Sequence, residues 1–157
     1  MDRSRRIGGG FATGIYARTA GGGVSITNSG TMGTIQSPLG AIGIDAAVTG
    51  GSGDLVVSNS GTLRTFGSAV ITMSNTGTGN LRLDSDGVIN APALFAVSTF
   101  AASGTSTLNV RANLTSTNGT AVRAQSFSGA INASVASGVQ VAGAGGFALT
   151  SSSGALA

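Results

Sequence analysis

Short runs of alternating apolar and polar residues recur along the chain, separated by corners rich in glycine, serine and asparagine. Each recurrence opens with a small residue followed by an apolar one, and these openings define a degenerate repeat of about 27 residues. The repeats begin near Gly14, Ala41, Ala69, Ala96, Ala121 and Ala148. We therefore expect a flexible or capping segment over residues 1–13 and a repeat domain over residues 14–157, with a truncated sixth repeat.

Each repeat carries further apolar segments after its opening. The second is clearest at Val24-Ser25-Ile26, Leu55-Val56-Val57, Leu81-Arg82-Leu83, Leu108-Asn109-Val110 and Ile131-Asn132-Ala133. A third, shorter one follows a turn, as in Gly61-Thr62-Leu63. Strands this short do not stand alone, but stacked on their equivalents one coil away they form long parallel sheets. The pattern predicts an all-β fold, a right-handed parallel β-helix (β-solenoid) of about five coils.

The alternation also assigns one side of each strand to the interior, because successive side chains point to opposite faces of a sheet. The resulting interior is aliphatic and consists of Ile15, Val24, Ile26, Ile42, Leu55, Val57, Leu63, Val70, Leu81, Leu83, Ile89, Val97, Leu108, Val110 and Val122.

Composition supports this interpretation and excludes several others. The chain has 27 glycines, no cysteine, histidine or tryptophan, and only 8% charged residues, which disfavours a bundle of amphipathic helices. A hydrophobic content of 41% with low net charge favours a packed core over disorder. The net charge of +3 depends on arginines near the N-terminus, so we expect no nucleic-acid partner. No apolar run is long enough for a transmembrane helix.

One corner motif recurs as Thr27-Asn28-Ser29-Gly30 and Ser58-Asn59-Ser60-Gly61, and Asp84-Ser85-Asp86-Gly87 fills its place in the third coil. Glycine at such a corner suggests a positive φ, and Asn or Asp side chains can bond the turn backbone. Stacked Asn side chains would also form a ladder between coils. The predicted turn and ladder residues are Asn28, Gly30, Asn59, Gly61, Asp86 and Gly87.

The main charged cluster consists of Arg82, Asp84, Asp86 and Arg111. Aligning Leu81-Arg82-Leu83-Asp84 with Leu108-Asn109-Val110-Arg111 places Asp84 beside Arg111 in the next coil, as an inter-coil ion pair. The alternative is an acidic site of the kind that β-helix polysaccharide lyases and hydrolases carry on their outer face. Because no histidine, lysine or glutamate is available to assist, we expect no catalytic, cofactor-binding or metal-binding residues, no cofactor and no enzymatic activity.

The segments Ile26-Thr27-Asn28-Ser29-Gly30-Thr31-Met32 and Val57-Ser58-Asn59-Ser60-Gly61-Thr62-Leu63 resemble the repeats of bacterial autotransporter passengers and hemagglutinin-type exoproteins. The resemblance implies secretion through a C-terminal β-barrel translocator, attachment to the outer membrane at the cell surface, and adhesion to host-surface or matrix glycans or proteins. The leading hypothesis is therefore a non-catalytic structural or adhesive passenger segment. Two alternatives remain, namely a solenoid that stacks end to end with copies of itself and a fragment of a polysaccharide-active β-helix enzyme.

Overall fold

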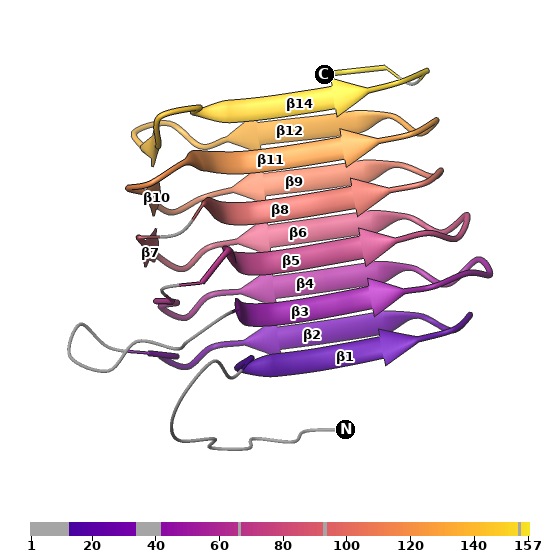
Figure 1. Ribbon diagram of the computed structural model, residues 1–157, viewed down its shortest axis with the longest axis horizontal. Helices are drawn as coiled ribbons and strands as arrows, with labels where there is room; N and C mark the ends of the chain where they lie inside the picture. Colours follow the sequence, from indigo (N-terminus) through magenta and orange to yellow (C-terminus); the bar gives the residue numbers. More distant parts are fainter. Residues whose placement is uncertain (1–12, 34–41, 66, 93, 154) are drawn as a thin grey trace.

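The computed structural model describes residues 13–33, 42–65, 67–92, 94–153 and 155–157, and all regular elements in these residues are β-strands. Figure 1 shows that the strands stack in layers from the N-terminal to the C-terminal end of the chain. They form a β-solenoid of about five turns with about 26 residues per turn. The predicted all-β solenoid is therefore confirmed, with a repeat close to the expected length.

Three parallel sheets make up the solenoid. The six-stranded sheet consists of β1 (Ile15–Thr19), β3 (Ile42–Val48), β5 (Ala69–Asn75), β8 (Phe95–Ala101), β11 (Thr120–Ser126) and β14 (Phe147–Ser151). The five-stranded sheet consists of β2 (Val24–Asn28), β4 (Leu55–Asn59), β6 (Leu81–Ser85), β9 (Ser106–Val110) and β12 (Ile131–Val135). The three-stranded sheet consists of β7 (Ile89–Ala91), β10 (Leu114–Ser116) and β13 (Val141–Ala142).

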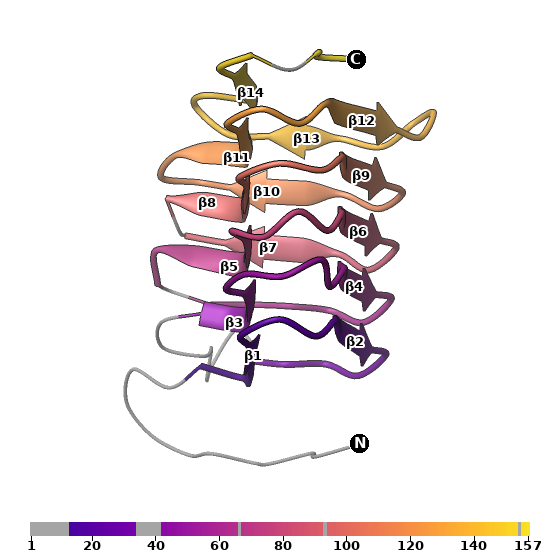
Figure 2. The same ribbon diagram turned by 90° about the vertical axis from the view of Figure 1, so that its right-hand side faces the viewer.

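The third, fourth and fifth coils visit all three sheets in turn, whereas the first two, among the described residues, reach the third side only through isolated bridges at Met32 and Leu63. Figure 2 shows this short third side, with β7, β10 and β13 beside the two larger sheets. Backbone hydrogen bonds of the sheets run between coils, because every strand pair is parallel and joins consecutive coils. The offset between paired residues is 31 for Asn28 and Asn59 but 25 for Asp84 and Asn109. The first coil is therefore longer than the later ones.

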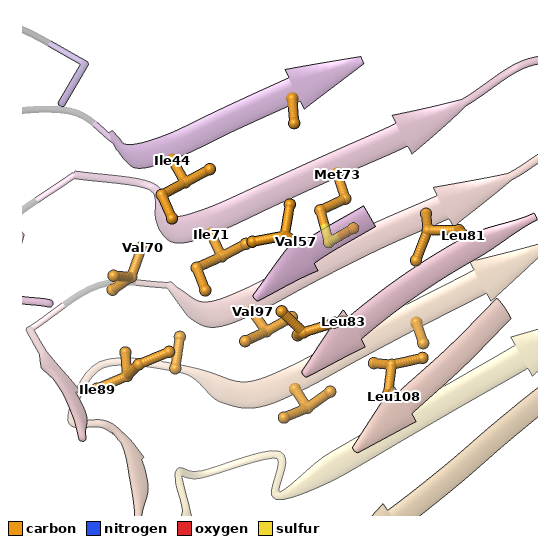
Figure 3. Packing of buried hydrophobic residues seen from close by; sticks show 14 of the residues in the cluster. Ile44, Val57, Val70, Ile71, Met73, Leu81, Leu83, Ile89, Val97 and Leu108 are labelled. Carbon is orange, nitrogen blue, oxygen red and sulfur yellow. The ribbon is translucent and has the colours of Figure 1, made fainter. Parts of the chain in front are cut away.

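The interior is filled by aliphatic side chains from all three sheets (Figure 3). Most of the predicted interior residues are buried there, whereas Ile15, Val24 and Ile42 are only half-buried. Burial of a large aliphatic side chain stabilises a fold by about 1.5–3 kcal/mol, so these columns are a main source of stability. Large, fully buried side chains that the sequence pattern did not single out for the interior are Ile44, Val48, Ile71, Met73, Leu114 and Ile131.

The predicted equivalence of residues in the six-stranded sheet is wrong by two residues at both ends of the solenoid and by one residue at Val70. Ile15 pairs with Ile44 rather than with Ile42, and Phe147 rather than Leu149 continues this row in the last coil. A shift of two residues along a strand leaves every side chain on its original face. At the two ends the apolar pattern therefore specifies the face without specifying the register.

At Val70 the pattern also misses the row by one residue, because Val70 and Ile71 are both buried. Ile42 pairs with Ala69, and Val97 pairs with Ile71, so Val70 lies one position away from the predicted row.

Candidate functional site

The predicted asparagine ladder lies at the corner that follows the five-stranded sheet. Asn28 Nδ2 donates a hydrogen bond of 2.7 Å to Asn59 Oδ1 in the next coil. Each amide also closes its own turn, since Asn28 Nδ2 lies 3.1 Å from Gly30 O and Asn59 Nδ2 lies 3.0 Å from Gly61 O. Asn59 is fully buried. The two side chains therefore satisfy buried polar groups within a coil and between coils.

The ladder stops at the third coil, where Ser85 is the register partner of Asn59. The hydroxyl of Ser85 is buried and has no hydrogen-bond partner. The prediction that Asp86 serves as a ladder residue is wrong, because it lies one position beyond this row. Its backbone N–H donates to Asn59 O at 2.7 Å, but its carboxylate accepts hydrogen bonds from Arg111.

The expected positive φ at the corner glycines is also wrong. Among the described residues, glycines with positive φ are Gly33, Gly50, Gly51, Gly104, Gly138 and Gly146. Gly61 and Gly87 are required for another reason, which is close approach between coils. A Cβ on Gly61 would overlap the carbonyl oxygen of Gly30, and a Cβ on Gly87 would overlap that of Gly61. The stacked turns therefore leave no room for a side chain.

The charged cluster forms a connected network on the outer face of the five-stranded sheet. Arg82 holds Asp84 with two hydrogen bonds, Nε to Oδ2 at 2.7 Å and Nη2 to Oδ1 at 3.2 Å. Arg111 Nη2 lies 3.2 Å from Asp84 Oδ1, and Arg111 Nε lies 2.5 Å from Asp86 Oδ1. The structure thus brings Asp84 and Arg111 together, although each has a closer charged partner.

The alignment used to predict this contact is wrong by two residues. Asp84 lies opposite Asn109 in the sheet, and Asn109 Nδ2 donates to Asp84 Oδ1 at 2.9 Å. Asn109 in turn accepts a hydrogen bond of 3.0 Å from the hydroxyl of Ser134. Arg111 therefore reaches Asp84 diagonally, from the corner beyond the strand end. The network extends over three consecutive coils.

Electrostatics within the network favour the charged forms of Arg82, Asp84 and Arg111. Burial of Asp84 raises the pKa of its carboxyl group, but hydrogen bonds from Arg82 and Asn109 and the charges of Arg82 and Arg111 outweigh this effect, so that its pKa lies below the usual value. The pKa values of Arg82 and Arg111 are raised, chiefly by their hydrogen bonds to Asp84 and Asp86 respectively. Within the described residues, no group of three or more acidic, histidine or cysteine side chains could hold a metal ion. The arrangement therefore suits inter-coil cross-linking better than proton transfer.

Asn75 is a corner residue that the sequence analysis missed. It is the fully buried last residue of β5, and its Nδ2 lies 3.1 Å from both Gly53 O and Gly79 O. Its Oδ1 accepts the backbone N–H of Gly77 at 3.0 Å. The signal was present, since Asn75-Thr76-Gly77 repeats the Asn-x-Gly spacing of the ladder corner.

A second group that the sequence analysis missed lies on the outer face of the six-stranded sheet. Arg18 Nη2 lies 3.1 Å from Asp45 Oδ2, and the Arg18 guanidinium carbon lies 5.0 Å from the centre of the Tyr16 ring. The guanidinium carbon of Arg123 lies 5.4 Å from the centre of the Phe95 ring. The contacts of Asp45 and Phe95 cross between coils, so a reliable register was needed to predict them.

Comparison with known proteins gives no relative from which a function could be transferred. The chain matches no protein-family model, no curated protein and no solved structure. In the part of the chain that the structure describes, no helix is long and apolar enough to cross a membrane. The class of the protein, a parallel β-solenoid repeat protein, therefore rests on its own strand pairing.

Proposed function

We infer that this chain is a non-catalytic structural and adhesive segment of an exported bacterial surface protein of the autotransporter type. The observation that carries the proposal is the use of polar groups to join coils. Asp45 is held by Arg18, Asp84 and Asp86 are held by Arg82 and Arg111, and the corner amides bond their own turns and neighbouring coils. Carboxylates engaged in this way support the coil stack.

Export through an outer-membrane pore provides a physical reason for two further features of the chain. A polypeptide that crosses the periplasm unfolded benefits from the absence of cysteine, because no disulfide can trap it there. A solenoid can also fold coil by coil, because each coil contacts chiefly its neighbours. In the full-length protein we expect a C-terminal β-barrel translocator that leaves the rod attached to the outer membrane.

The export proposal is tested by placing the chain between a signal peptide and a β-barrel translocator. We expect the chain to reach the surface of intact cells, where added protease removes it without lysing the cells. Gly61→Ala provides the control, because its Cβ would overlap the preceding coil and destabilise the stack, and we expect less of this variant at the cell surface. Retention of the wild-type chain in the periplasm would contradict the proposal.

The absence of catalysis has its own test. The purified chain is incubated with acidic and neutral polysaccharides, and newly formed reducing and unsaturated ends are measured. We expect no release above the level of the buffer. Release that disappears in Asp84→Asn and Asp86→Asn variants would support the alternative of a polysaccharide-active enzyme and would overturn the proposal.

End-to-end stacking of copies is a second candidate, favoured by the outer coils of the described residues. β1 and β14 each pair with one neighbouring strand, and interior residues such as Ile15 and Phe147 are only half-buried there. A second copy continuing the sheets would cover these residues and pair the strand edges. Light scattering distinguishes the candidates, since stacking requires a mass that grows with concentration, whereas a constant monomer mass excludes it.

A further inference from the structure

Apart from Phe147, which packs against the interior, the aromatic side chains of the described residues gather on one face of the rod. Tyr16 in β1 and Phe100 in β8 point outward from the six-stranded sheet, with exposed fractions of 62% and 38%. Phe127 directly follows β11 and is 65% exposed. No described residue on the outer face of the five-stranded sheet is aromatic. Several exposed rings on a single face indicate an interaction surface.

The strand register arranges this surface into two outward-facing rows that run along the rod. One row contains Tyr16, Asp45, Thr72, Ser98, Arg123 and Ala148. The other contains Arg18, Ala47, Ser74, Phe100, Gln125 and Thr150. This is the side of the sheet that faces the reader in Figure 1. We call these two rows, together with Phe95 and Phe127, the aromatic face.

Large side chains on the aromatic face are separated by runs of smaller ones, an arrangement that suits an elongated ligand. Tyr16 and Arg123 stand in the same row four strand spacings apart, which corresponds to about 19 Å. Between them lie Asp45, whose carboxylate is held by Arg18, and the hydroxyl groups of Thr72 and Ser98. Aromatic rings and guanidinium groups therefore lie at both ends of a stretch of smaller side chains that can donate and accept hydrogen bonds.

The charge on this face is not balanced. Arg18 is neutralised by Asp45 at 3.1 Å. Arg123 stacks on Phe95, and none of the described acidic side chains forms an ion pair with it. On the five-stranded sheet, by contrast, Arg82 is paired with Asp84. The aromatic face therefore offers a guanidinium group that is available to an anionic ligand.

We propose that the aromatic face binds an acidic polysaccharide that lies along the rod axis. Tyr16 and Phe100 stack on the apolar faces of sugar rings, while Arg123 pairs with a carboxylate or sulfate group. The hydroxyls of Thr72 and Ser98 bond sugar hydroxyls between these points. The inference rests on the proposed adhesive function and names its partner class.

The test measures binding of the full chain by calorimetry to polygalacturonate, which carries carboxylates, and to dextran sulfate, with neutral dextran as the uncharged control. We expect binding to at least one acidic polymer and none to dextran. Loss of the free guanidinium in Arg123→Gln lowers the affinity about tenfold, and Phe100→Ala lowers it about fivefold. The acidic polymer that binds more tightly identifies the anionic group.

A charge-matched control on the opposite sheet makes the test specific. Arg82→Gln removes the same charge from the five-stranded sheet and leaves the affinity unchanged if the aromatic face is the site. An equal loss of affinity in Arg82→Gln and Arg123→Gln would mean that binding follows net charge alone, and would overturn the proposal. Absence of binding to both acidic polymers would overturn it as well.

Failure of polysaccharide binding by the aromatic face can be distinguished from failure of the adhesive function. All of the substituted side chains are at least partly exposed, so circular dichroism and urea unfolding should show folded variants. If beads coated with the chain adhere to host cells but the chain binds neither acidic polymer, the aromatic face is wrong and the adhesive function stands. If the beads do not adhere either, the adhesive part of the proposed function also fails.

Discussion

Replacement of Asn75 by alanine should be among the most damaging polar-to-apolar changes in this molecule. The side chain is fully buried at the C-terminal end of β5, where the corner begins. Its amide group has two hydrogens, and the carbonyl oxygens of Gly53, Gly79 and Asn80 lie within 3.1, 3.1 and 3.3 Å of its nitrogen. Its oxygen accepts the Gly77 N–H at 3.0 Å. Gly53 belongs to the preceding coil, so Asn75→Ala weakens both the turn and the stack.

The expected loss follows from the number of hydrogen bonds. Two donor hydrogens and one acceptor give three effective bonds, each worth about 0.5–1.5 kcal/mol in net stability. The substitution also leaves the buried N–H of Gly77 without its partner, and an unsatisfied buried group costs about 1–3 kcal/mol. Asn75→Ala should therefore lower the free energy of unfolding by about 3–5 kcal/mol. Asn75→Asp should also be harmful, because a buried carboxylate cannot donate to these carbonyls.

Urea unfolding followed by circular dichroism measures this loss through the shift of the midpoint at constant slope. The matched control is Asn90→Ala, which truncates an exposed asparagine in β7 and should change stability by less than about 0.5 kcal/mol. If Asn75→Ala costs no more than Asn90→Ala, the corner hydrogen bonds do not stabilise the stack, and the reasoning is refuted.

Three further predictions concern the ladder, the stacked glycines and the charged network. Ser85→Asn should raise the free energy of unfolding by about 1 kcal/mol, because it extends the ladder from Asn59 and replaces a buried hydroxyl without a partner. Gly61→Ala should cost more than about 2 kcal/mol in urea unfolding, whereas Gly21→Ala, with open space around its Cβ, should be almost neutral. Asp84 has a lowered pKa in the folded state, so its stabilising contribution is present above the unfolded value near 4 and is lost as the pH falls below it. The Asp84→Asn variant should therefore lose less stability than the wild type between about pH 5 and pH 2.

Each of these predictions has an outcome that contradicts it. A destabilised Ser85→Asn variant would show that the third corner has no room for an amide. Equal stability of the two glycine variants would show that the turns do not stack as closely as the structure indicates. Parallel acid-unfolding curves for the wild type and Asp84→Asn would show that the network does not favour the ionised carboxylate.

The architecture could be predicted from the sequence because the repeat itself shows the alternation of apolar and polar residues and the positions of the corners. Alternation fixes which side chains point inward, and Gly, Ser and Asn mark the corners. The recurrence of Leu55-Val56-Val57 as Leu81-Arg82-Leu83 gave the correct register between β4 and β6. In these two coils, the apolar strand residues are followed directly by the polar corner, so only one alignment matches both features.

Register was predicted less well where several alignments keep the same alternation. Ile42 and Ile44 point to the same side, so either could follow Ile15, and the choice depends on how much chain the corners consume. The same uncertainty of two residues placed Asp84 opposite Arg111 instead of Asn109. Contacts between coils inherit every register error, because they join residues far apart in the sequence.

The sequence pattern also failed to predict that the corner glycines are needed for close approach between coils. A positive φ and a tight contact both require glycine, and composition does not separate them. Gly61 must be glycine because the carbonyl oxygen of Gly30, in the preceding coil, occupies the place of a Cβ. The two residues come together only when one coil stacks on the other. Such a contact becomes visible when the coils are stacked in space.

The stacked register is the central claim, and engineered disulfides test it most directly, since the chain has no native cysteine. Thr72 and Ser98 are direct partners on the outer face of β5 and β8, so their Cα atoms should lie about 5 Å apart, within the range for a disulfide. The double variant Thr72→Cys/Ser98→Cys should therefore oxidise readily in the folded state. Thr72→Cys/Phe100→Cys, displaced by two residues, should remain reduced under the same conditions. Equal cross-linking of both pairs, or preferential cross-linking of the displaced pair, would contradict the account.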